Sequence, residues 1–251
     1  MKESSGLVDF HCHLDLLPDL ETAYQRCDEI GCTTLTMTTT PKAFPRNRVF
    51  AERSTHVRAA LGLHPQLVSE RGHEIELFEQ LLPSTRYVGE IGLDAGKQFY
   101  SSFAEQQRVF DRAIAACADQ GEKIISVHSA RCARKVLDVI ESRSVTDSCQ
   151  VILHWFSAGK AEIDRAVRLG CWFSINQRMM ASPSGLSIIE QAPRESLLTE
   201  TDAPFLEIEK CRVEPGEVSG TLALIANALD LTDIETRSLI ASNARRLLDE
   251  K

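Results

Sequence analysis

One pattern repeats along the whole chain and constrains its fold more than any other feature. A short apolar run, typical of a buried strand, is followed by a longer stretch with the periodicity of an amphipathic helix, and the pair then recurs. Strands that alternate with helices favour a parallel sheet. The candidate strands are Leu7–Phe10, Thr34–Thr38, Val57–Leu61, Tyr87–Ile91, Ile124–Val127, Val151–Leu153, Cys171–Ile175 and Leu197–Thr199.

The clearest candidate helix is Phe103–Gln120, in which apolar residues recur on one face. The others are Leu20–Ile30, Ala133–Glu141, Lys160–Leu169 and Thr232–Leu248. This pattern predicts an α/β fold, a single (β/α)8 TIM barrel, with a distorted or seven-stranded barrel and an open doubly wound sheet as alternatives. The length of 251 residues suits such a barrel, which needs about 250. No linker-like segment divides the chain, so residues 1–251 are predicted to form one domain, although the length alone would permit two small ones.

The net charge of −8 limits the class of partner. Proteins that bind duplex DNA tightly usually present a basic face, so this charge argues against sequence-tolerant duplex binding. It leaves open a phosphate substrate, because bound divalent ions can dominate the charge of a site. Residues 1–5 show no apolar leader, no 18-residue apolar run follows, and the eight cysteines form no CxxC pair. We therefore expect a cytoplasmic protein with reduced thiols and no membrane partner.

Two histidines lie two residues apart at the end of the first candidate strand, in Asp9-Phe10-His11-Cys12-His13. On an extended chain His11 and His13 project from the same face, which is the arrangement that two ligands of one metal ion need. A buried, hydrogen-bonded histidine pair is the alternative. Cys12 should point to the opposite face and serve packing.

Further metal-binding residue types stand where later candidate strands end. Glu90 lies between apolar Val88 and Ile91, where an unpaired carboxylate would be expensive, and two glycines beside it allow a close approach of backbone or substrate. The carboxyl ends of barrel strands meet at one mouth. We therefore expect one metal centre, and its donor set suits two divalent ions. The candidate ligands are His11, His13, Glu90, His128, His154 and Asp202.

His64, in Gly62-Leu63-His64-Pro65, follows the third candidate strand. The same geometry would bring it to the mouth of the barrel as a substrate-binding residue. A histidine that caps a loop before proline is the alternative.

These segments resemble the TatD family of metal-dependent deoxyribonucleases, within the amidohydrolase-like barrels. The similarity runs through most of the chain, and the motifs GEIGLD and ETDAP are individually specific. The segments are Asp9–Asp15, Gly62–Pro65, Gly89–Asp94, His128, His154–Ser157 and Glu200–Phe205.

The resemblance implies cleavage of DNA phosphodiester bonds, often from a 3′ end, with two divalent ions (Mg²⁺, Mn²⁺ or Zn²⁺). It assigns His11, His13, Glu90 and Asp202 to one ion and Glu90, His128 and His154 to the other. Glu90 and Asp202 would be the catalytic residues, with Asp202 orienting or deprotonating the attacking water. The expected substrate is single-stranded DNA or a 3′ end.

A narrower resemblance links the chain to QatD, the TatD-like component of the Qat antiphage defence system. It rests on Asp9–Leu16, Thr38–Pro41 and His154–Ser157. It implies a role in antiviral defence, with a QueC-like protein and an ATPase as partners. Phage nucleic acid or a modified nucleotide would then be the substrate.

The sequence departs from the TatD pattern at three places, all of them expected at the substrate rim. Ala95-Gly96-Lys97 stands where the family has an aromatic pair. Ala130 stands where an arginine is usual, and Arg131 follows it. Arg212–Pro215 reads Arg-Val-Glu-Pro instead of Arg-Asn-Glu-Pro. Two alternatives to a nuclease therefore stay open. One is hydrolysis of a non-DNA ester, amide or modified nucleotide, because one fold supports many reactions. The other is a non-catalytic metal-binding subunit of a defence complex.

Overall fold

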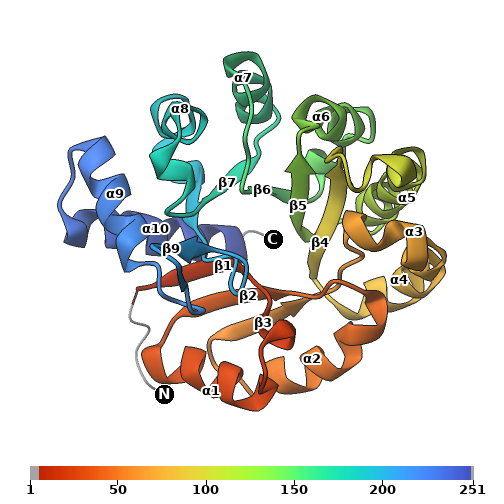
Figure 1. Cartoon of the computed structure of the whole chain (residues 1–251), viewed down its shortest axis with the longest axis horizontal. Helices are drawn as coiled ribbons and strands as arrows, with labels where there is room; N and C mark the ends of the chain where they lie inside the picture. Colours follow the sequence, from red (N-terminus) through yellow and green to blue (C-terminus); the bar gives the residue numbers. More distant parts are fainter. Residues whose placement is uncertain (1–5, 250–251) are drawn as a thin grey trace. The chain divides into compact units, whose positions relative to one another are not determined.

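The computed structural model describes residues 6–249, so residues 1–5, in which the sequence shows no apolar leader, lie outside it (Figure 1). Contacts divide the chain into two compact units. Among the described residues, the first unit comprises residues 6–36, 46–59 and 173–249, and the second comprises residues 37–45 and 60–172. Within residues 6–249, no helix combines the length and apolar character needed to cross a bilayer.

The first unit contains a sheet in the order β1-β2-β3 and a parallel pair, β7 and β8. Strand β1 runs parallel to β2, with an irregularity in register between Asp9 and Cys12. The Thr199 hydroxyl donates a hydrogen bond to the Val8 carbonyl, which ties β8 to β1. The strands are β1 (Val8–Cys12), β2 (Thr33–Met37), β3 (Val57–Ala60), β7 (Trp172–Ile175), β8 (Leu197–Thr199) and the hairpin β9 (Glu207–Ile208) and β10 (Cys211–Arg212). The helices are α1 (Leu20–Ile30), α2 (Phe44–Ala51), α8 (Pro183–Gln191), α9 (Ser219–Leu229) and α10 (Asp233–Asp249).

The second unit contains three parallel strands in the order β4-β5-β6. Helix α5 packs beside β4 and buries the apolar face expected from its sequence, including Val109, Ala113 and Cys117 (Figure 1). The strands are β4 (Tyr87–Asp94), β5 (Ile124–Ala130) and β6 (Gln150–His154). The helices are α3 (Val68–Arg71), α4 (Ile75–Leu81), α5 (Phe103–Gln120), α6 (Ala133–Ser142) and α7 (Lys160–Arg168). Short 3-10 helices lie at Leu14–Leu16, Pro41–Ala43, Pro65–Leu67, Gly72–Glu74, Leu82–Ser84, Tyr100–Ser102, Val145–Asp147, Met179–Ala181 and Arg194–Ser196.

Local sequence signals set several of these boundaries. Asp19 caps the start of helix α1, because its carboxylate accepts hydrogen bonds from the backbone N–H groups of Glu21 and Thr22. Gly31 follows the last residue of the helix and has a φ of 65°, in the left-handed region that glycine adopts without strain. Both boundaries of α1 and of α5 match the predicted ranges.

Two predicted strand ends were wrong in a way that matters for the site. The strand predicted to end at Ile91 continues to Asp94, and the one predicted to end at Val127 continues to Ala130. The two strands keep pairing over these added residues, and a side-chain oxygen of Gln106 accepts a hydrogen bond from the Asp94 N–H. Glu90 therefore lies in the middle of its strand rather than next to its end, and His128 lies inside a strand rather than after it.

Candidate metal centre

In the first unit, the structure brings His11, His13 and Asp202 together. All three residues are buried. The Asp202 Oδ1 atom lies 3.8 Å from His11 Nε2 and 3.6 Å from His13 Nε2. One ligand atom from each residue lies within 4.8 Å of the other two. We call these three residues the first cluster.

Backbone pairing between β1 and the segment after β8 positions the first cluster. The Asp202 N–H donates to the His11 carbonyl at 2.8 Å, and the His13 N–H donates to the Ala203 carbonyl at 2.7 Å. Asp202 has a φ of 49°, so the chain turns there. The turn delivers its carboxylate to the two imidazoles.

Asp9 also holds the segment after β8 in place, through hydrogen bonds to its carboxylate. Its fully buried carboxylate accepts hydrogen bonds from the Thr201 N–H at 2.9 Å, the Thr201 hydroxyl at 2.7 Å and the Gly216 N–H at 2.8 Å. Burial raises the pKa of Asp9 to about 6 against the effect of these hydrogen bonds. Three donors converge on one carboxylate, so Asp9 fixes the residue next to Asp202. No local pattern in the sequence predicts this role of Asp9.

In the second unit, three histidines surround Glu90, which is 1 % exposed. His128 Nδ1 lies 2.6 Å from Glu90 Oε1, His154 Nε2 lies 3.8 Å from the same oxygen, and His64 Nε2 lies 3.2 Å from Oε2. His64 Nδ1 accepts a hydrogen bond from the Gln66 N–H, so in the neutral ring Nε2 carries the proton and donates to Glu90. We call Glu90, His64, His128 and His154 the second cluster.

The register of β4, β5 and β6 explains the second cluster. Val127 pairs with Leu153, so His128 and His154 follow at the same level of adjacent parallel strands. Between Val88 and Ile91 the register of β4 against β5 shifts, and Glu90 lies in this irregularity. The expectation that glycines beside Glu90 serve a close backbone approach is confirmed. A Cβ added to Gly92, whose φ is 148°, would lie 2.1 Å from the His128 carbonyl oxygen.

Replacement of Gly92 by alanine is expected to destabilise the protein by about 3 kcal/mol, because the clash is with backbone that cannot rotate away. For a chain of this size that loss lowers the melting temperature by roughly 6–12 °C. Thermal unfolding checks this value. Gly170→Ala is the matched control, since Gly170 has a φ of 73° and nothing within 4 Å of the added Cβ. A Gly92→Ala loss no larger than that of Gly170→Ala would contradict the steric argument.

Asp94 completes the surroundings of His128. Its Oδ2 atom lies 3.2 Å from His128 Nε2 and accepts a hydrogen bond from Gln66 Nε2 at 2.8 Å, while Oδ1 accepts one from the Gly96 N–H at 2.7 Å. His128 is thus held between two carboxylates. Burial alone would lower its pKa, but the charges and hydrogen bonds of Glu90 and Asp94 outweigh burial and raise the pKa to about 10.

The donor chemistry of both clusters fits divalent ions. Ligand atoms that share an ion at about 2.1 Å each lie roughly 3–4 Å apart. The separations of 3.6 and 3.8 Å in the first cluster, and of 3.8 Å between His154 and Glu90, agree with this. His128 and Glu90 are at hydrogen-bonding distance, and Asp94 is placed to hold the far ring nitrogen of His128 as a metal-bound histidine requires.

Two of the three departures from the TatD pattern are neighbours in the second unit. The Ala95 N–H donates to the Ala130 carbonyl at 3.0 Å. Small side chains therefore stand side by side where the pattern has an aromatic pair and an arginine. Arg131, which follows, is exposed and has a φ of 59°.

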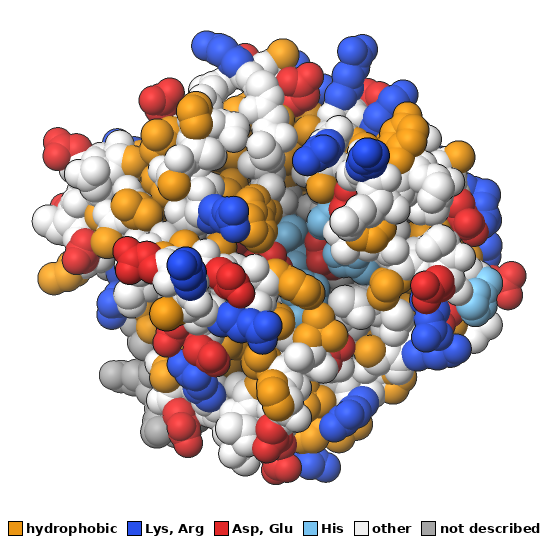
Figure 2. Space-filling model, viewed as in Figure 1, with side chains coloured by type: hydrophobic (Ala, Val, Ile, Leu, Met, Phe, Trp, Pro, Cys, Tyr) orange, Lys and Arg blue, Asp and Glu red, His pale blue; other side chains and the backbone are white. Residues whose placement is uncertain are grey.

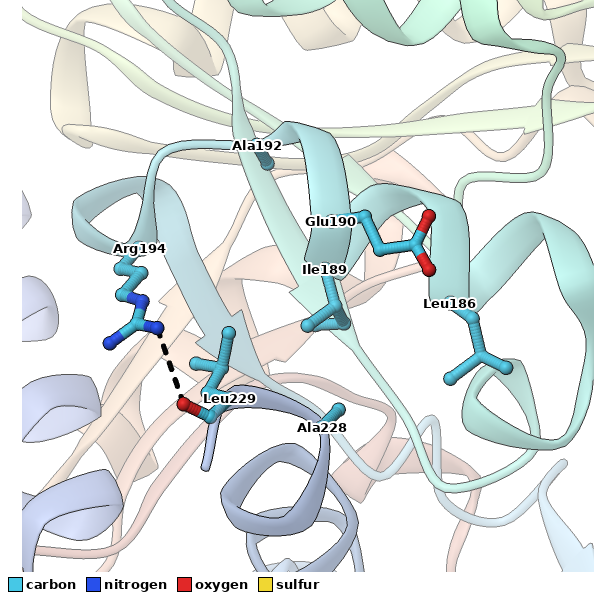
Figure 3. A pocket seen from close by; sticks show the side chains of 7 residues that line it. All are labelled: Leu186, Ile189, Glu190, Ala192, Arg194, Ala228 and Leu229. Carbon is cyan, nitrogen blue, oxygen red and sulfur yellow. Dashed lines mark hydrogen bonds between the residues drawn. The ribbon is translucent and has the colours of Figure 1, made fainter. Parts of the chain in front are cut away.

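Basic and acidic side chains are mixed on the visible face of the molecule in Figure 2, where Lys and Arg are interspersed with Asp and Glu. A cavity of about 450 Å³ lies beside α8 and α9 in the first unit, where Arg194 donates a hydrogen bond to the Leu229 carbonyl (Figure 3). None of its lining residues is a candidate metal ligand.

Comparison with known proteins decides the family. The model of the family described as TatD related DNase matches residues 8–249. The chain belongs to the TatD family. As a member it is a metal-dependent hydrolase of the deoxyribonuclease class.

Individual relatives cover most of this chain. Human deoxyribonuclease TATDN3 is 27% identical over 96% of the chain and 94% of its own length. The 3′-5′ ssDNA/RNA exonuclease TatD of Musicola paradisiaca is 28% identical over 58% of the chain and 56% of its own length. The crystal structure of the TatD homologue YjjV from Escherichia coli aligns with a TM-score of 0.85 at 24% identity, covering 96% of this chain and 97% of that one. This likeness confirms the predicted α/β fold of the TIM-barrel type.

Proposed function

We propose that this TatD-family chain cleaves the phosphodiester bonds of single-stranded DNA or of 3′ ends with two divalent ions, one held by each cluster. The observation that carries the proposal is the grouping of imidazoles around Asp202 in one unit and around Glu90 in the other. The family and the name of the Musicola exonuclease support the choice of DNA and of polarity. The assignment of Glu90 to both ions stays a prediction of the resemblance.

When bound, Mg²⁺, Mn²⁺ or Zn²⁺ would supply Lewis acidity to the phosphodiester and neutralise the charge that develops during hydrolysis. Residues of the chain itself would accept the proton and bind the substrate. Asp202 has a buried carboxylate that can accept the proton of the attacking water. His64, 13% of whose side chain is accessible, is the proposed substrate-binding residue, and its contact with Glu90 fixes its ring.

End-labelled single- and double-stranded DNA, incubated with the protein and each metal ion in turn, tests the proposal. We expect a ladder of shortened products from single strands, with the label position showing the polarity, and no cleavage after chelation of the metal. Intact DNA with every ion, while the protein still binds metal, would overturn it.

A second candidate keeps the metal centre and changes the bond. The net charge of −8 and the alanine at position 130, where an arginine is usual, favour a substrate less charged than DNA. Turnover of small phosphodiesters, amides or modified nucleotides, together with intact DNA, would select this candidate.

We also propose that the chain acts in the cytoplasm as the TatD-like component of a Qat antiphage system, beside a QueC-like protein and an ATPase. The segments shared with QatD support this, and eight free thiols suit a reducing compartment. Cells that express the chain together with these partners should be protected from phage, and the Asp202→Ala substitution should abolish this protection. Protection that survives this change would indicate a non-catalytic metal-binding subunit instead.

A further inference from the structure

Phe205 is an exposed aromatic residue in contact with a candidate metal ligand. Its side chain is 57% exposed, although a phenylalanine gains about 2 kcal/mol from burial. The ring meets that of His13 edge to face, with centroids 5.3 Å apart and planes at 80°. Its neighbour Leu206 is fully buried, so the exposure belongs to this one side chain.

The backbone around Phe205 is held in place. The Phe205 N–H donates to the Asp202 carbonyl at 2.8 Å, and the Val213 N–H donates to the Leu206 carbonyl at 2.9 Å. The same segment is fastened to β1 through Ala203 and His13. The ring therefore stands at a fixed position beside the first cluster. Because its backbone is already ordered, binding of a ligand would not have to order it.

The hairpin that follows Phe205 offers no basic patch for a nucleic-acid backbone. The hairpin that follows carries Glu207 and Glu209 against Lys210 and Arg212, which sum to zero. Proteins that bind single strands without sequence preference combine a basic groove with aromatic side chains on which bases stack. Where the basic component is weak, stacking has to supply more of the affinity.

We propose that Phe205 is the stacking platform for the nucleobase next to the scissile phosphate, which makes a single-stranded nucleotide the unit that the first cluster recognises. This rests on the proposed nuclease function. Every base presents a π-face, so the contact accepts any sequence. In a duplex, stacking on the neighbouring bases covers that face, so the platform also selects unpaired nucleotides that can leave the stack.

The test compares Phe205 variants on two single-stranded oligonucleotides, one normal and one with abasic nucleotides at both ends. On the normal strand Phe205→Ala is expected to raise KM by about 5- to 150-fold, the equivalent of one stacked base, with kcat changed much less. Phe205→Trp should restore KM. Phe205→Leu, which still covers His13 with apolar atoms, should not. On the abasic strand the wild type should already show the higher KM that Phe205→Ala has on the normal strand. Phe205→Ala should not raise the KM for the abasic strand any further.

Three results would overturn the proposal. Phe205→Leu could match the wild type, Phe205→Ala could lose the same factor on abasic DNA, or both variants could lose metal affinity by calorimetry, which would show that the ring acts through His13. Tyr100→Ala is the control, since Tyr100 is 62% exposed but stacks on Phe103 instead of a candidate ligand. Cleavage of normal DNA by the wild type separates these results from failure of the nuclease proposal itself.

Discussion

Replacement of Glu90 by glutamine is expected to lower kcat for DNA cleavage by about 1000-fold or more. Glu90 is the carboxylate that three imidazoles approach within 3.8 Å in the second cluster, and it is almost completely buried. Glutamine keeps the shape but removes the negative charge that a divalent ion requires there. A bound ion contributes several kcal/mol to hydrolysis, and about 4 kcal/mol corresponds to a 1000-fold change in rate.

The number of bound ions gives a second measurement, independent of activity. If Glu90 serves both ions, as the resemblance implies, the metal content of Glu90→Gln should fall from two ions per chain to none under conditions that keep the wild type loaded. If it serves the second cluster alone, one ion should stay with His11, His13 and Asp202. Glu79→Gln is the matched control, because Glu79 pairs with Arg112 outside both clusters. Two bound ions and full cleavage in Glu90→Gln would contradict the proposed role.

The sequence allowed most strands, the longest helices and the candidate metal ligands to be predicted for a physical reason, whereas the division of these ligands between two ions came only from the resemblance. Strand–helix alternation and the two-residue spacing of His11 and His13 are local patterns, and local patterns survive in a single sequence. The polar residues expected at the strand ends were identified by their position after apolar runs. Helix α9 was missed because its sequence is apolar with little contrast between faces, so no polar stripe marked it.

The residues that support the candidate ligands could not be predicted in the same way. Asp9 acts through partners 192 and 207 residues away, which no local pattern reveals. Asp94 was within reach of prediction. Glu90, Gly92 and Asp94 alternate along one strand and share a face, but the strand was ended at Ile91 and the alternation was cut short. The boundary was wrong because Gly92 weakens a strand signal, whereas here glycine is what the neighbouring backbone requires.

Asp94→Asn is expected to weaken metal binding by about 10- to 100-fold, with a parallel loss of activity, although Asp94 is not a candidate ligand. Burial alone would raise the pKa of Asp94, but hydrogen bonds from His128, Gln66 and Gly96 lower it to about 2. The group is therefore a carboxylate at neutral pH, and it accepts from His128 Nε2 while Nδ1 faces Glu90. An asparagine has only one oxygen. Its amide donors would therefore face either the Gly96 N–H or the donors of His128 and Gln66, all of which need an acceptor.

Calorimetric titration of metal-free protein measures this effect directly, and it separates support of His128 from general damage to the fold. Asp111→Asn provides the control, since Asp111 forms an ion pair with Arg143 on the surface of α5 and touches neither cluster. We expect its metal affinity and melting temperature to stay within experimental error of the wild type. Unchanged metal affinity in Asp94→Asn would show that Glu90 alone orients His128. Weakened affinity with an unchanged melting temperature would establish Asp94 as the residue that holds this imidazole for its ion.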